Sequence, residues 1–421
     1  MSWLAVVGIG EEGLEALSPA GRALIEEAEF LFGGARHLAM VPQSATERCL
    51  WERPLCRSIE RIALYRGRRV VVLASGNPLW FGIGAALARR FPREEMTVLP
   101  QPSAFSLAAA RLLWPLEDCL LLSLHGRPFE ELRLHLAPGR RLLILSEGGT
   151  TPKEVARLLC ELGWGESRLE VFAHLGGARE TSIRAEARAF GERLVPALNL
   201  IALTCKGEPG ARALPRVSGL PDEAFEHDGQ ITKREVRAAT LAALHPLPGE
   251  RLWDLGAGCG SIAIEWLRLG EGRKAIAVER NRERAAMIAR NAARLGVPGL
   301  NICCAEAGAA LASLPRPDAV FLGGGVAAEG LLEASWQALP EGGRLVANVV
   351  STEGEARILD WQKRNGGSLC RIAVSRAEPA GAGGKLHLWR AFAAVTQLAA
   401  TKAGRALPGT PEEPGASGAG G

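Results

Sequence analysis

The chain has 421 residues, 47% of them hydrophobic and 23% charged, with a formal net charge of +4 and a pI near 8.6. This length favours two or three domains with substantial cores, and the basic excess is too small for a dedicated nucleic-acid binder. The scattered arginines suit either a small polyanionic substrate or solvated helix faces.

Three further features restrict the class of protein. No stretch approaches ~18 uninterrupted apolar residues, and no basic, then apolar, leader precedes the first strand-like run. The nine cysteines form no C-x-x-C pair, so neither a disulfide framework nor a zinc site is indicated. We therefore expect a reduced, cytoplasmic protein with no metal and no membrane partner.

The first half of the chain alternates short aliphatic runs with amphipathic helical segments. The predicted strands are Leu4–Val7, Val70–Ala74, Thr97–Leu99, Cys119–Ser123, Arg141–Leu145, Leu169–Ala173 and Leu198–Thr204. They cannot all be parallel neighbours with full crossovers. Two α/β subdomains that share one cleft fit the pattern better.

A segment rich in proline, glycine and mixed charge follows, from about Lys206 to Gly229. We predict a first domain over residues 1–210, a linker over 211–228 and a second domain over 229–395. The end of the chain, residues 404–421, is rich in Pro, Gly, Ala and Ser and is predicted to be disordered.

The second domain opens with a strand, Arg251–Leu255, that runs directly into Gly256-Ala-Gly258-Cys-Gly260 and a helix from Ser261 to about Leu269. Glycines at alternate positions let the backbone turn off the strand and approach a ligand, and the helix N-terminus faces the ligand's polar end. A dinucleotide site would need G-x-G-x-x-G, so this spacing favours an adenosyl amino acid over NAD. Asp254 is placed to orient the ligand's ammonium group, or simply to stabilise the turn.

Acids follow the next two predicted strands. Ala275–Val278 ends at Glu279, with Asn281 as a plausible cap of a helix through Leu295, and Leu300–Cys304 is followed by Glu306 and Ala307. The first acid can accept both ribose hydroxyls, and the second can accept the adenine amino group beside a small residue. Open α/β sheets bind ligands at the carboxyl ends of their strands, so the three strand ends together predict a Rossmann-like S-adenosylmethionine site.

The fourth strand, Ala319–Leu322, opens into Gly323-Gly-Gly325, where amino-group methyltransferases usually carry Asn/Asp-Pro-Pro. This difference argues against a nucleic-acid substrate. An NAD-dependent reductase, an RNA or other small-molecule methyltransferase with a non-catalytic N-terminal module, and a non-catalytic tetrapyrrole carrier remain as alternatives.

Two groups of motifs carry a family resemblance. The stretch from His227 to Glu235 and the glycine motif resemble the decarboxylating precorrin methyltransferase domain. The first half resembles the tetrapyrrole methylase family in four segments, namely Val6–Glu11, Ala74–Leu79, Pro102–Ser106 and Ile144–Pro152. In this order they resemble the fused precorrin-6B (precorrin-6Y) C5,15-methyltransferases of cobalamin biosynthesis, and the segment from Trp389 to Gln397 also fits that form.

The resemblance implies a reaction. Two S-adenosylmethionine molecules would methylate C5 and C15 of the reduced tetrapyrrole, and the ring C acetate would leave as carbon dioxide, giving precorrin-8X. The first domain would act at C5, and the second at C15 and on the acetate. No metal is implied, and pairing of apolar helices suggests a homo-oligomer.

The resemblance also carries site residues over. In the second domain these are Gln230, Gly256 to Gly260, Glu279, Glu306 and Ala307. The family usually has Pro at position 230 and Asp at 279 and 306, so the acids here reach one methylene further. In the first domain the expected cleft residues are Gly8, Gly10, Gly76, Asn77, Ser103, Ala104 and Ser146.

The sequence indicates the residues that contact the substrate less clearly than those that bind the cofactor. Lys233, Arg234 and Arg376 could hold substrate carboxylates, although solvated surface charge is the more common role for any one of them. His227 and His245 could donate protons or be structural, and no catalytic acid is assigned. Positioning in a dry site would supply most of the catalysis.

Overall fold

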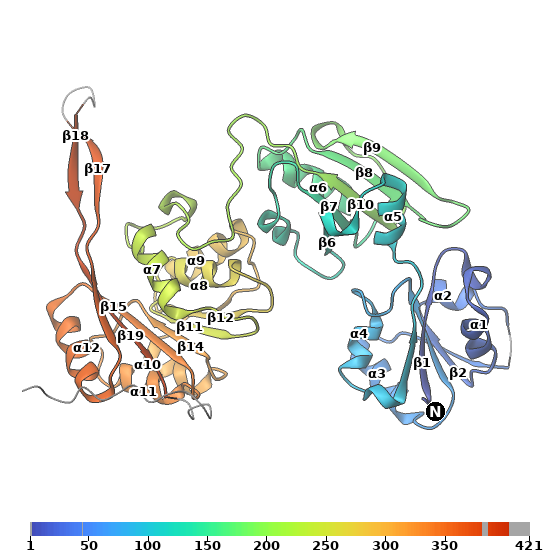
Figure 1. The fold of residues 1–421 in the computed structure, drawn as a ribbon, viewed down its shortest axis with the longest axis horizontal. Helices are drawn as coiled ribbons and strands as arrows, with labels where there is room; N and C mark the ends of the chain where they lie inside the picture. Colours follow the sequence, from blue (N-terminus) through green and yellow to red (C-terminus); the bar gives the residue numbers. More distant parts are fainter. Residues whose placement is uncertain (1, 44, 381–385, 404–421) are drawn as a thin grey trace, which may run out of the picture. The chain divides into compact units, whose positions relative to one another are not determined.

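A computed structural model of the chain describes residues 2–43, 45–380 and 386–403 (Figure 1). The chain forms two compact units. The first contains residues 1–129 and 136–213, and the second contains residues 130–135 and everything from Leu214 onward. The tail predicted to be disordered, 404–421, lies outside the described residues.

The first sheet of unit 1 is entirely parallel, with the order β3-β2-β4-β1-β5. Its strands are β1 (Leu4–Ile9), β2 (Phe30–Gly33), β3 (Glu47–Leu50), β4 (Val70–Ser75) and β5 (Met96–Leu99). The helices that follow them are α1 (Pro19–Glu26), α2 (Ala35–Ala39), α3 (Leu55–Leu64) and α4 (Ile83–Ala88). Both faces of the sheet carry a buried apolar cluster, because parallel strands are covered on both sides.

The second sheet of unit 1 is mixed, with the order β6-β7-β10-β8-β9. Only β6 and β7 are parallel. Its strands are β6 (Cys119–Ser123), β7 (Arg141–Leu145), β8 (Arg168–Ala173), β9 (Thr181–Glu186) and β10 (Asn199–Thr204), with α5 (Ala104–Leu112) and α6 (Thr151–Glu161). Two separate sheets within one unit agree with the predicted pair of α/β subdomains.

Unit 2 is built on a seven-stranded sheet with the order β13-β12-β11-β14-β15-β19-β16. Its strands are β11 (Arg251–Leu255), β12 (Lys274–Val278), β13 (Asn301–Cys303), β14 (Ala319–Leu322), β15 (Arg344–Val349), β16 (Ser368–Ile372) and β19 (Val395–Thr401). The first five in this order are parallel, and β19 is antiparallel to both neighbours. The order reverses at β11, so the gap beside β11 and β14 is the expected ligand crevice.

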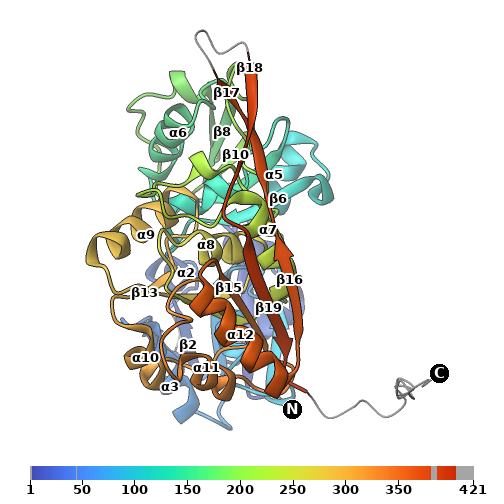
Figure 2. The same ribbon diagram turned by 90° about the vertical axis from the view of Figure 1, so that its left-hand side faces the viewer.

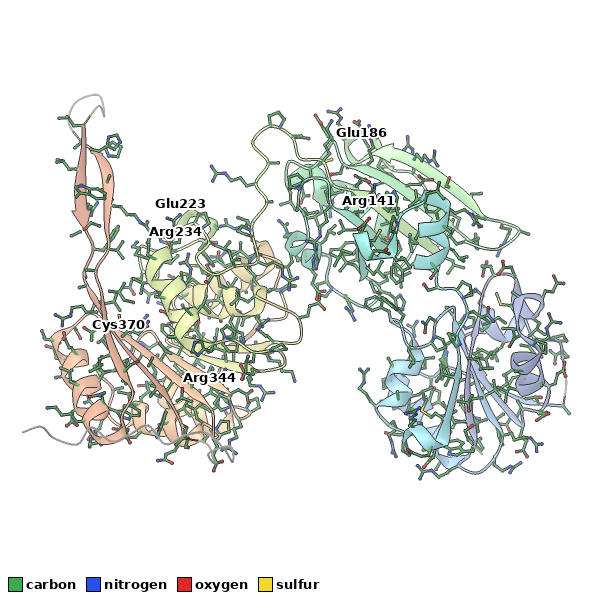
Figure 3. All side chains as sticks on the ribbon, viewed as in Figure 1. Arg141, Glu186, Glu223, Arg234, Arg344 and Cys370 are labelled. Carbon is green, nitrogen blue, oxygen red and sulfur yellow. The ribbon has the colours of Figure 1, made fainter. Side chains whose placement is uncertain are left out.

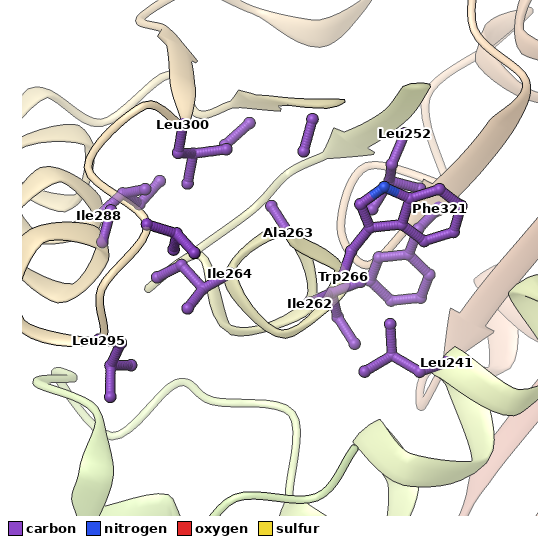
Figure 4. Packing of buried hydrophobic residues seen from close by; sticks show 14 of the residues in the cluster. Leu241, Leu252, Ile262, Ala263, Ile264, Trp266, Ile288, Leu295, Leu300 and Phe321 are labelled. Atoms are coloured by element: carbon purple, nitrogen blue, oxygen red, sulfur yellow. The ribbon is translucent and has the colours of Figure 1, made fainter. Parts of the chain in front are cut away.

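Six α-helices of the described residues accompany this sheet. They are α7 (Arg234–Leu244), α8 (Ser261–Arg268), α9 (Arg282–Arg294), α10 (Ala307–Ala310), α11 (Leu331–Ala338) and α12 (Thr352–Asn365). Alternate residues of β11 enter opposite cores: Leu252 joins one cluster with α7, α8 and α9, while Trp253 joins the other with α11 and α12. Figure 4 shows the first of these clusters, with Trp266 and Phe321 packed beside Leu252.

Strands β17 (Ser375–Ala380) and β18 (Leu386–Ala391) form a separate antiparallel hairpin. Figure 2 shows this hairpin running out beyond the seven-stranded sheet. Every side chain of β18 is exposed, including Leu386, Leu388 and Trp389. The hairpin therefore leaves an apolar surface uncovered within the described chain.

Unit 2 starts earlier and ends later than the predicted range of 229–395. Leu220 and Phe225, inside the predicted linker, are buried in the core with α8. Strand β19 extends the sheet to Thr401. Proline and glycine content indicated an irregular segment correctly, but irregular backbone can still be packed when apolar side chains anchor it.

Candidate functional site in each unit

A cavity of about 710 Å³ lies in unit 2 at the carboxyl ends of its parallel strands. The glycine loop after β11, the ends of β12 and β13, and the Gly323–Gly325 loop after β14 all contribute to its wall. Of the residues predicted to bind the cofactor, those that line it are Gln230, Gly256, Ala257, Gly258, Cys259, Glu279, Glu306 and Ala307. The predicted spatial grouping of these eight residues is therefore present.

The glycine loop needs its glycines for two different reasons. Gly256, Gly258 and Gly260 all have positive φ, which strains any other residue. A Cβ on Gly256 would lie 3.0 Å from the backbone of Gly324, so the loops after β11 and β14 approach closely. Gly260 does not line the cavity. A Cβ there would lie 2.8 Å from Ile288, so this glycine permits packing of α8 against α9.

Glu279 closes one side of the glycine loop. Its carboxylate accepts hydrogen bonds from the Gly258 N–H at 2.9 Å and from the Asn281 N–H at 2.9 Å, and only 6% of the residue is exposed. Asn281 caps α9, as predicted, by accepting from Glu283 and Arg284 N–H. Each carboxylate oxygen retains acceptor capacity for a ligand hydroxyl. Glu306, by contrast, is exposed at the start of α10 and makes no capping hydrogen bond.

Asp254 lies beneath the cavity rather than in its wall. It is 1% exposed, and Oδ2 accepts a hydrogen bond from the Ala263 N–H at 3.0 Å, while Oδ1 has no partner. Burial, and secondarily the charge of Glu279, raises the pKa of Asp254 to about 7. The direct contact with the helix backbone fits the turn-stabilising alternative better than direct contact with a ligand.

The opposite wall of the cavity is formed by the root of the hairpin and by β15. Phe392 lies there, with the Lys233 ammonium 5.4 Å from its ring centroid. Asn348 also lines the cavity, and its amide is held by Thr240 at 2.8 Å and Gln397 at 2.9 Å. Sequence patterns did not single out Asn348 or Phe392, since neither belongs to a spaced motif.

The other predicted substrate groups lie outside the cavity wall. Arg376 pairs with Asp222 at 2.9 Å and with Glu235 at 2.7 Å, so its charge is already compensated. Arg234, labelled in Figure 3, is an exposed residue 3.4 Å from Glu235. The structure therefore leaves Lys233 as the one cavity residue among the three predicted cations.

His227 and His245 do not line the cavity either. The His227 ring accepts a hydrogen bond from the Gly229 N–H, and His245 ends α7 in a left-handed conformation. Both residues are exposed. These environments fit the structural role that was left open for them.

A buried ion network fixes the segment that leads to Gln230. Arg237, which is 0% exposed, donates to Glu265 at 2.6 Å, to Asp222 at 3.3 Å and to the Thr232 carbonyl at 2.5 Å. Glu265 also accepts the N–H groups of Gly219 and Leu220. One arginine thus ties the irregular entry segment to α7 and α8.

Unit 1 brings its predicted residues together chiefly by backbone contact. At the carboxyl edge of the parallel sheet, the Gly76 carbonyl accepts from the Gln101 N–H at 3.0 Å, and the Gly76 N–H donates to Ile9 at 3.2 Å. A Cβ on Gly8 would lie 1.9 Å from the Gly76 carbonyl, and one on Gly76 would lie 2.9 Å from Ser103. The ends of β1, β4 and β5 therefore meet where only glycine fits.

The remaining predicted residues of unit 1 are held by other contacts. Asn77 closes its own loop by accepting from the Leu79 N–H, and Ser103 caps α5, whose first residue is Ala104. Gly10 follows β1 and does not have a positive φ. A Cβ added there would approach only the Glu12 carboxylate. Ser146 follows β7 in the other sheet, and its buried hydroxyl has no partner.

Sequence reasoning missed a polar cluster beside Gly76. Glu11 accepts from Arg36 at 2.5 Å and contacts His174 Nδ1 at 2.9 Å. Burial opposes ionisation, but these two partners hold the pKa of Glu11 below its usual value. The His37 ring lies 3.0 Å from Ser75, and burial together with Arg36 lowers the pKa of His37 to about 4. Isolated polar residues far apart in the chain give no motif to detect.

Two family models match the chain, one in each unit. The model of tetrapyrrole (corrin/porphyrin) methylases matches residues 4–190, and the model of the precorrin methyltransferase domain matches residues 223–402. A precorrin-6Y C(5,15)-methyltransferase [decarboxylating] from Sinorhizobium sp is 50% identical over 95% of this chain and 96% of its own length. The chain belongs to this family.

Two further relatives match about half of the chain each. A cobalt-precorrin-7 C(5)-methyltransferase from Salmonella typhimurium is 34% identical, covering 42% of this chain and 87% of its own length. The crystal structure of the C-terminal domain of a precorrin-6Y C5,15-methyltransferase from Rhodobacter capsulatus is 41% identical and covers 45% of this chain and 100% of that domain, with a TM-score of 0.42.

Two features are absent from residues 2–43, 45–380 and 386–403. No helix there is both long and apolar enough to cross a membrane. No group of three His, Cys, Asp or Glu side chains there lies in a metal-binding arrangement.

Proposed function

We propose that the chain uses two S-adenosylmethionine molecules to methylate C5 and C15 of precorrin-6B and removes the ring C acetate as carbon dioxide, giving precorrin-8X. One observation carries the proposal: a relative named for both methylations and for decarboxylation aligns with 95% of the chain. The cavity of unit 2 and the glycine-lined strand ends of unit 1 supply one candidate cofactor site each.

We assign the C15 methylation and the decarboxylation to unit 2, and the C5 methylation to unit 1. The match of the precorrin methyltransferase domain model to residues 223–402 supports the first assignment. The match of the tetrapyrrole methylase model to residues 4–190 supports the second assignment. A relative named as a C(5)-methyltransferase also supports it, because 42% of this chain aligns with 87% of that relative.

The residues of unit 2 fit an adenosyl amino acid. The glycine loop lines the cavity, and the missing Cβ of Gly258 lets a ligand approach the loop backbone closely. Glu279 offers carboxylate oxygens for ribose hydroxyls. When bound, S-adenosylmethionine supplies an electrophilic methyl group. The chain's own contribution is to hold the cofactor and the macrocycle in line and to exclude water.

Lys233 is the residue we propose for a substrate carboxylate in unit 2. It lines the cavity beside Phe392 and forms no ion pair within the described structure, whereas Arg376 is compensated by two acids. A cation that pairs with a spectator carboxylate leaves the ring C acetate unpaired. The acetate can then leave as carbon dioxide while the electron pair of the broken C–C bond enters the substrate's conjugated system, and a proton subsequently replaces the carboxyl group.

We further propose a cytoplasmic homo-oligomer that uses the β17–β18 hairpin. All nine cysteines are free thiols, which suits a reducing compartment. Leu386 and Leu388, 69% and 65% exposed, lie on one face of β18, and Trp389, 78% exposed, lies on the other, so both faces of the hairpin carry exposed apolar side chains. Trp389→Asp should lower the molar mass measured by light scattering. An unchanged molar mass would show that the hairpin does not form the interface of the oligomer.

The central test is a reaction of the purified full-length chain with precorrin-6B and methyl-labelled S-adenosylmethionine. The expected result is two labelled methyl groups and one carbon dioxide per product. If the product carries one labelled methyl group and carbon dioxide is released, unit 1 is a carrier and not a methyltransferase. If no S-adenosylmethionine is consumed, the proposal is wrong.

A further inference from the structure

One side of the unit 2 cavity is not used by the proposed cofactor contacts. The glycine loop, Glu279 and Glu306 follow β11, β12 and β13, which lie toward one end of the seven-stranded sheet. Asn348 lines the cavity from β15, which lies beyond β14 and pairs there with β19. Asn348 therefore lies in the part of the cavity that is left for the substrate.

Asn348 belongs to a network of three polar side chains. The other two are buried, namely Thr240 of α7, which is 0% exposed, and Gln397 of β19, which is 5% exposed. Gln397 lies directly opposite Asn348 in the antiparallel pairing of β15 with β19, two strands that lie side by side in Figure 2. Neither Thr240 nor Gln397 lines the cavity. The partly exposed amide of Asn348 is thus the member of the network that a ligand can reach.

The network fixes the orientation of the Asn348 amide. The Thr240 hydroxyl donates to the Val236 carbonyl at 2.8 Å, so it can only accept from its other partners. Asn348 Nδ2 donates to this hydroxyl at 2.8 Å, and Gln397 Nε2 donates to it at 3.2 Å and to Asn348 Oδ1 at 2.9 Å. A flipped Asn348 amide would place its nitrogen against the Gln397 nitrogen, where two donors would face each other. The second hydrogen on Asn348 Nδ2 has no acceptor among the described residues.

The surroundings of this amide are apolar. Val346 lies two residues earlier on the same face of β15 and belongs to the buried cluster with α7. Val395 lies two residues before Gln397 and lines the cavity together with Val374. Burial of polar side chains among such residues costs free energy unless they are hydrogen-bonded, and apolar residues could fill the same space. A polar network at this wall therefore indicates a function for the group that it presents to the cavity.

We propose that Asn348 donates its remaining N–H to the ring C acetate and holds that carboxylate for decarboxylation. The inference rests on the proposed function and names the residue that binds the scissile group. In this step the bond between the methylene and carboxyl carbons of the acetate breaks, the carboxylate leaves as carbon dioxide, and the electron pair of the bond enters the conjugated system. A proton from water then replaces the carboxyl group.

A neutral donor suits this step better than a cation does. The acetate carries a full charge before carbon dioxide leaves and loses it in the reaction, so a cation would stabilise the starting state more than the transition state. One amide hydrogen bond instead fixes the direction of the breaking bond relative to the conjugated ring. Lys233 is the N-cap residue of α7, and Thr240 lies about two turns further along the helix. The cation and the amide are therefore placed to hold different carboxylates of one macrocycle.

The test uses the full-length chain with Asn348→Ala and precorrin-6B as the substrate. We expect kcat for carbon dioxide release to fall about 10- to 100-fold, because the acetate loses its hydrogen bond and its alignment. Two bound S-adenosylmethionine molecules in calorimetry and an unchanged melting temperature would show that the fold is intact. An unchanged kcat in this variant would overturn the inference.

Two further variants control for the substitution. Asn301→Ala removes an exposed asparagine outside the cavity and should release carbon dioxide at the wild-type rate. Asn348→Asp keeps the size of the side chain but repels the acetate, so its rate should fall further than that of Asn348→Ala. A loss in Asn301→Ala as large as in Asn348→Ala, or a wild-type rate in Asn348→Asp, would contradict the proposed contact.

Thr240 tests the orientation of the amide. It is a positioning residue, since it acts on the substrate only through Asn348. Thr240→Val removes the hydroxyl that accepts from Asn348 and should lower kcat for carbon dioxide release roughly 3- to 10-fold. Thr240→Ser keeps the hydroxyl and should retain the wild-type rate. An equal loss in both variants would show an effect of packing alone and would contradict the role of the network.

A binding measurement separates this inference from the proposed function. Uroporphyrin III and coproporphyrin III differ in that the acetate side chains of the first are methyl groups in the second. In equilibrium dialysis, Asn348→Ala should weaken binding of uroporphyrin III at one site by roughly threefold or more and leave binding of coproporphyrin III unchanged. This result supports acetate recognition even if the wild type releases no carbon dioxide from precorrin-6B, which would refute the proposed function alone. No loss for uroporphyrin III, or an equal loss for both porphyrins, would refute the acetate contact.

Discussion

The two candidate cofactor sites occupy the same place in their sheets but are built from different groups. In unit 2, the cavity wall carries an acid, Glu279, that binds the backbone of the glycine loop. In unit 1, the ends of β1, β4 and β5 meet through the backbone of Gly8, Gly76 and Ser103. Side-chain chemistry distinguishes the first site, and close backbone approach distinguishes the second.

This difference predicts which substitutions each site tolerates. A site built from side chains loses affinity when a functional group is removed, and the fold can remain intact. A site built from touching backbones is damaged when any atom is added. The supporting structure differs too, because unit 2 depends on a buried ion network around Arg237.

The largest expected effect falls on that network. Arg237→Met leaves Glu265 as a buried charge without its cationic partner and leaves Asp222 paired with Arg376 alone, which should lower the free energy of unfolding of unit 2 by about 3–5 kcal/mol. Denaturant unfolding followed by circular dichroism should show one weakened transition and one unchanged.

The matched control is Arg234→Met, three residues earlier on the same helix. Arg234 is exposed and pairs only with Glu235, so the expected change is below about 1 kcal/mol. An equal shift in both variants would show that the network does not hold the entry segment.

Next in size is Gly8→Ala. The added Cβ would lie 1.9 Å from the Gly76 carbonyl and 2.8 Å from the Gln101 nitrogen. Since both neighbours are backbone atoms, the strain should cost roughly 1–3 kcal/mol or more and separate the strand ends. Calorimetry should then find one bound S-adenosylmethionine instead of two.

Gly148→Ala controls for the substitution itself. Gly148 has an ordinary φ, and its Cβ would meet nothing within 4 Å, so both cofactor sites should remain. Retention of two sites in Gly8→Ala would mean that the strand ends can relax and that the contact is not required.

The sequence predicted strands β11 to β14 of unit 2 closely because motif residues follow them, whereas β15, β16 and β19 of the same sheet were not predicted. Arg251–Leu255 and Ala319–Leu322 have the bounds expected for them, and the acid after β12 lies where the topology requires. The small strand β2 and the edge strands β3 and β9 were not predicted, since short or half-exposed runs lack a clear period.

The parts of the sites that escaped prediction depend on tertiary contacts. Phe392 reaches the cavity because the hairpin root returns beside β15, and the Glu11 cluster joins segments that are far apart in sequence. Asp254 was correctly placed at a strand end, but its burial beneath the loop follows from the position of α8. No local pattern encodes such distances.

A smaller effect, confined to binding, is expected for Glu279→Gln. The amide can still fill the space, but it loses the charge that accepts the Gly258 and Asn281 N–H groups and the ligand hydroxyls. Charge-assisted hydrogen bonds contribute about 1.5–3 kcal/mol, so affinity at one of the two sites should fall roughly 10- to 100-fold. Calorimetry of the full chain should show one tight and one weakened site.

Glu271→Gln is the control for this change, because Glu271 is exposed and lies outside the cavity. Two tight sites should persist there. If Glu279→Gln keeps two tight sites, Glu279 does not bind the ribose and only stabilises the glycine loop.

The last effect is a pH dependence of the stability of unit 2 that Asp254 causes. Burial raises the pKa of Asp254 to about 7, above the value for an unfolded chain. Between these two values the folded state binds more protons than the unfolded state, so stability falls as pH rises from about 4 to 7, by up to about 1.4 kcal/mol per pH unit. Asp254→Asn removes this titration while keeping an oxygen that accepts from the Ala263 N–H. The free energy of unfolding of this variant should therefore depend less on pH, and at pH 8 it should exceed that of the wild type. Unchanged S-adenosylmethionine affinity in this variant would confirm the turn-stabilising role. A loss of affinity at constant stability would instead show that Asp254 binds the ammonium group of the ligand.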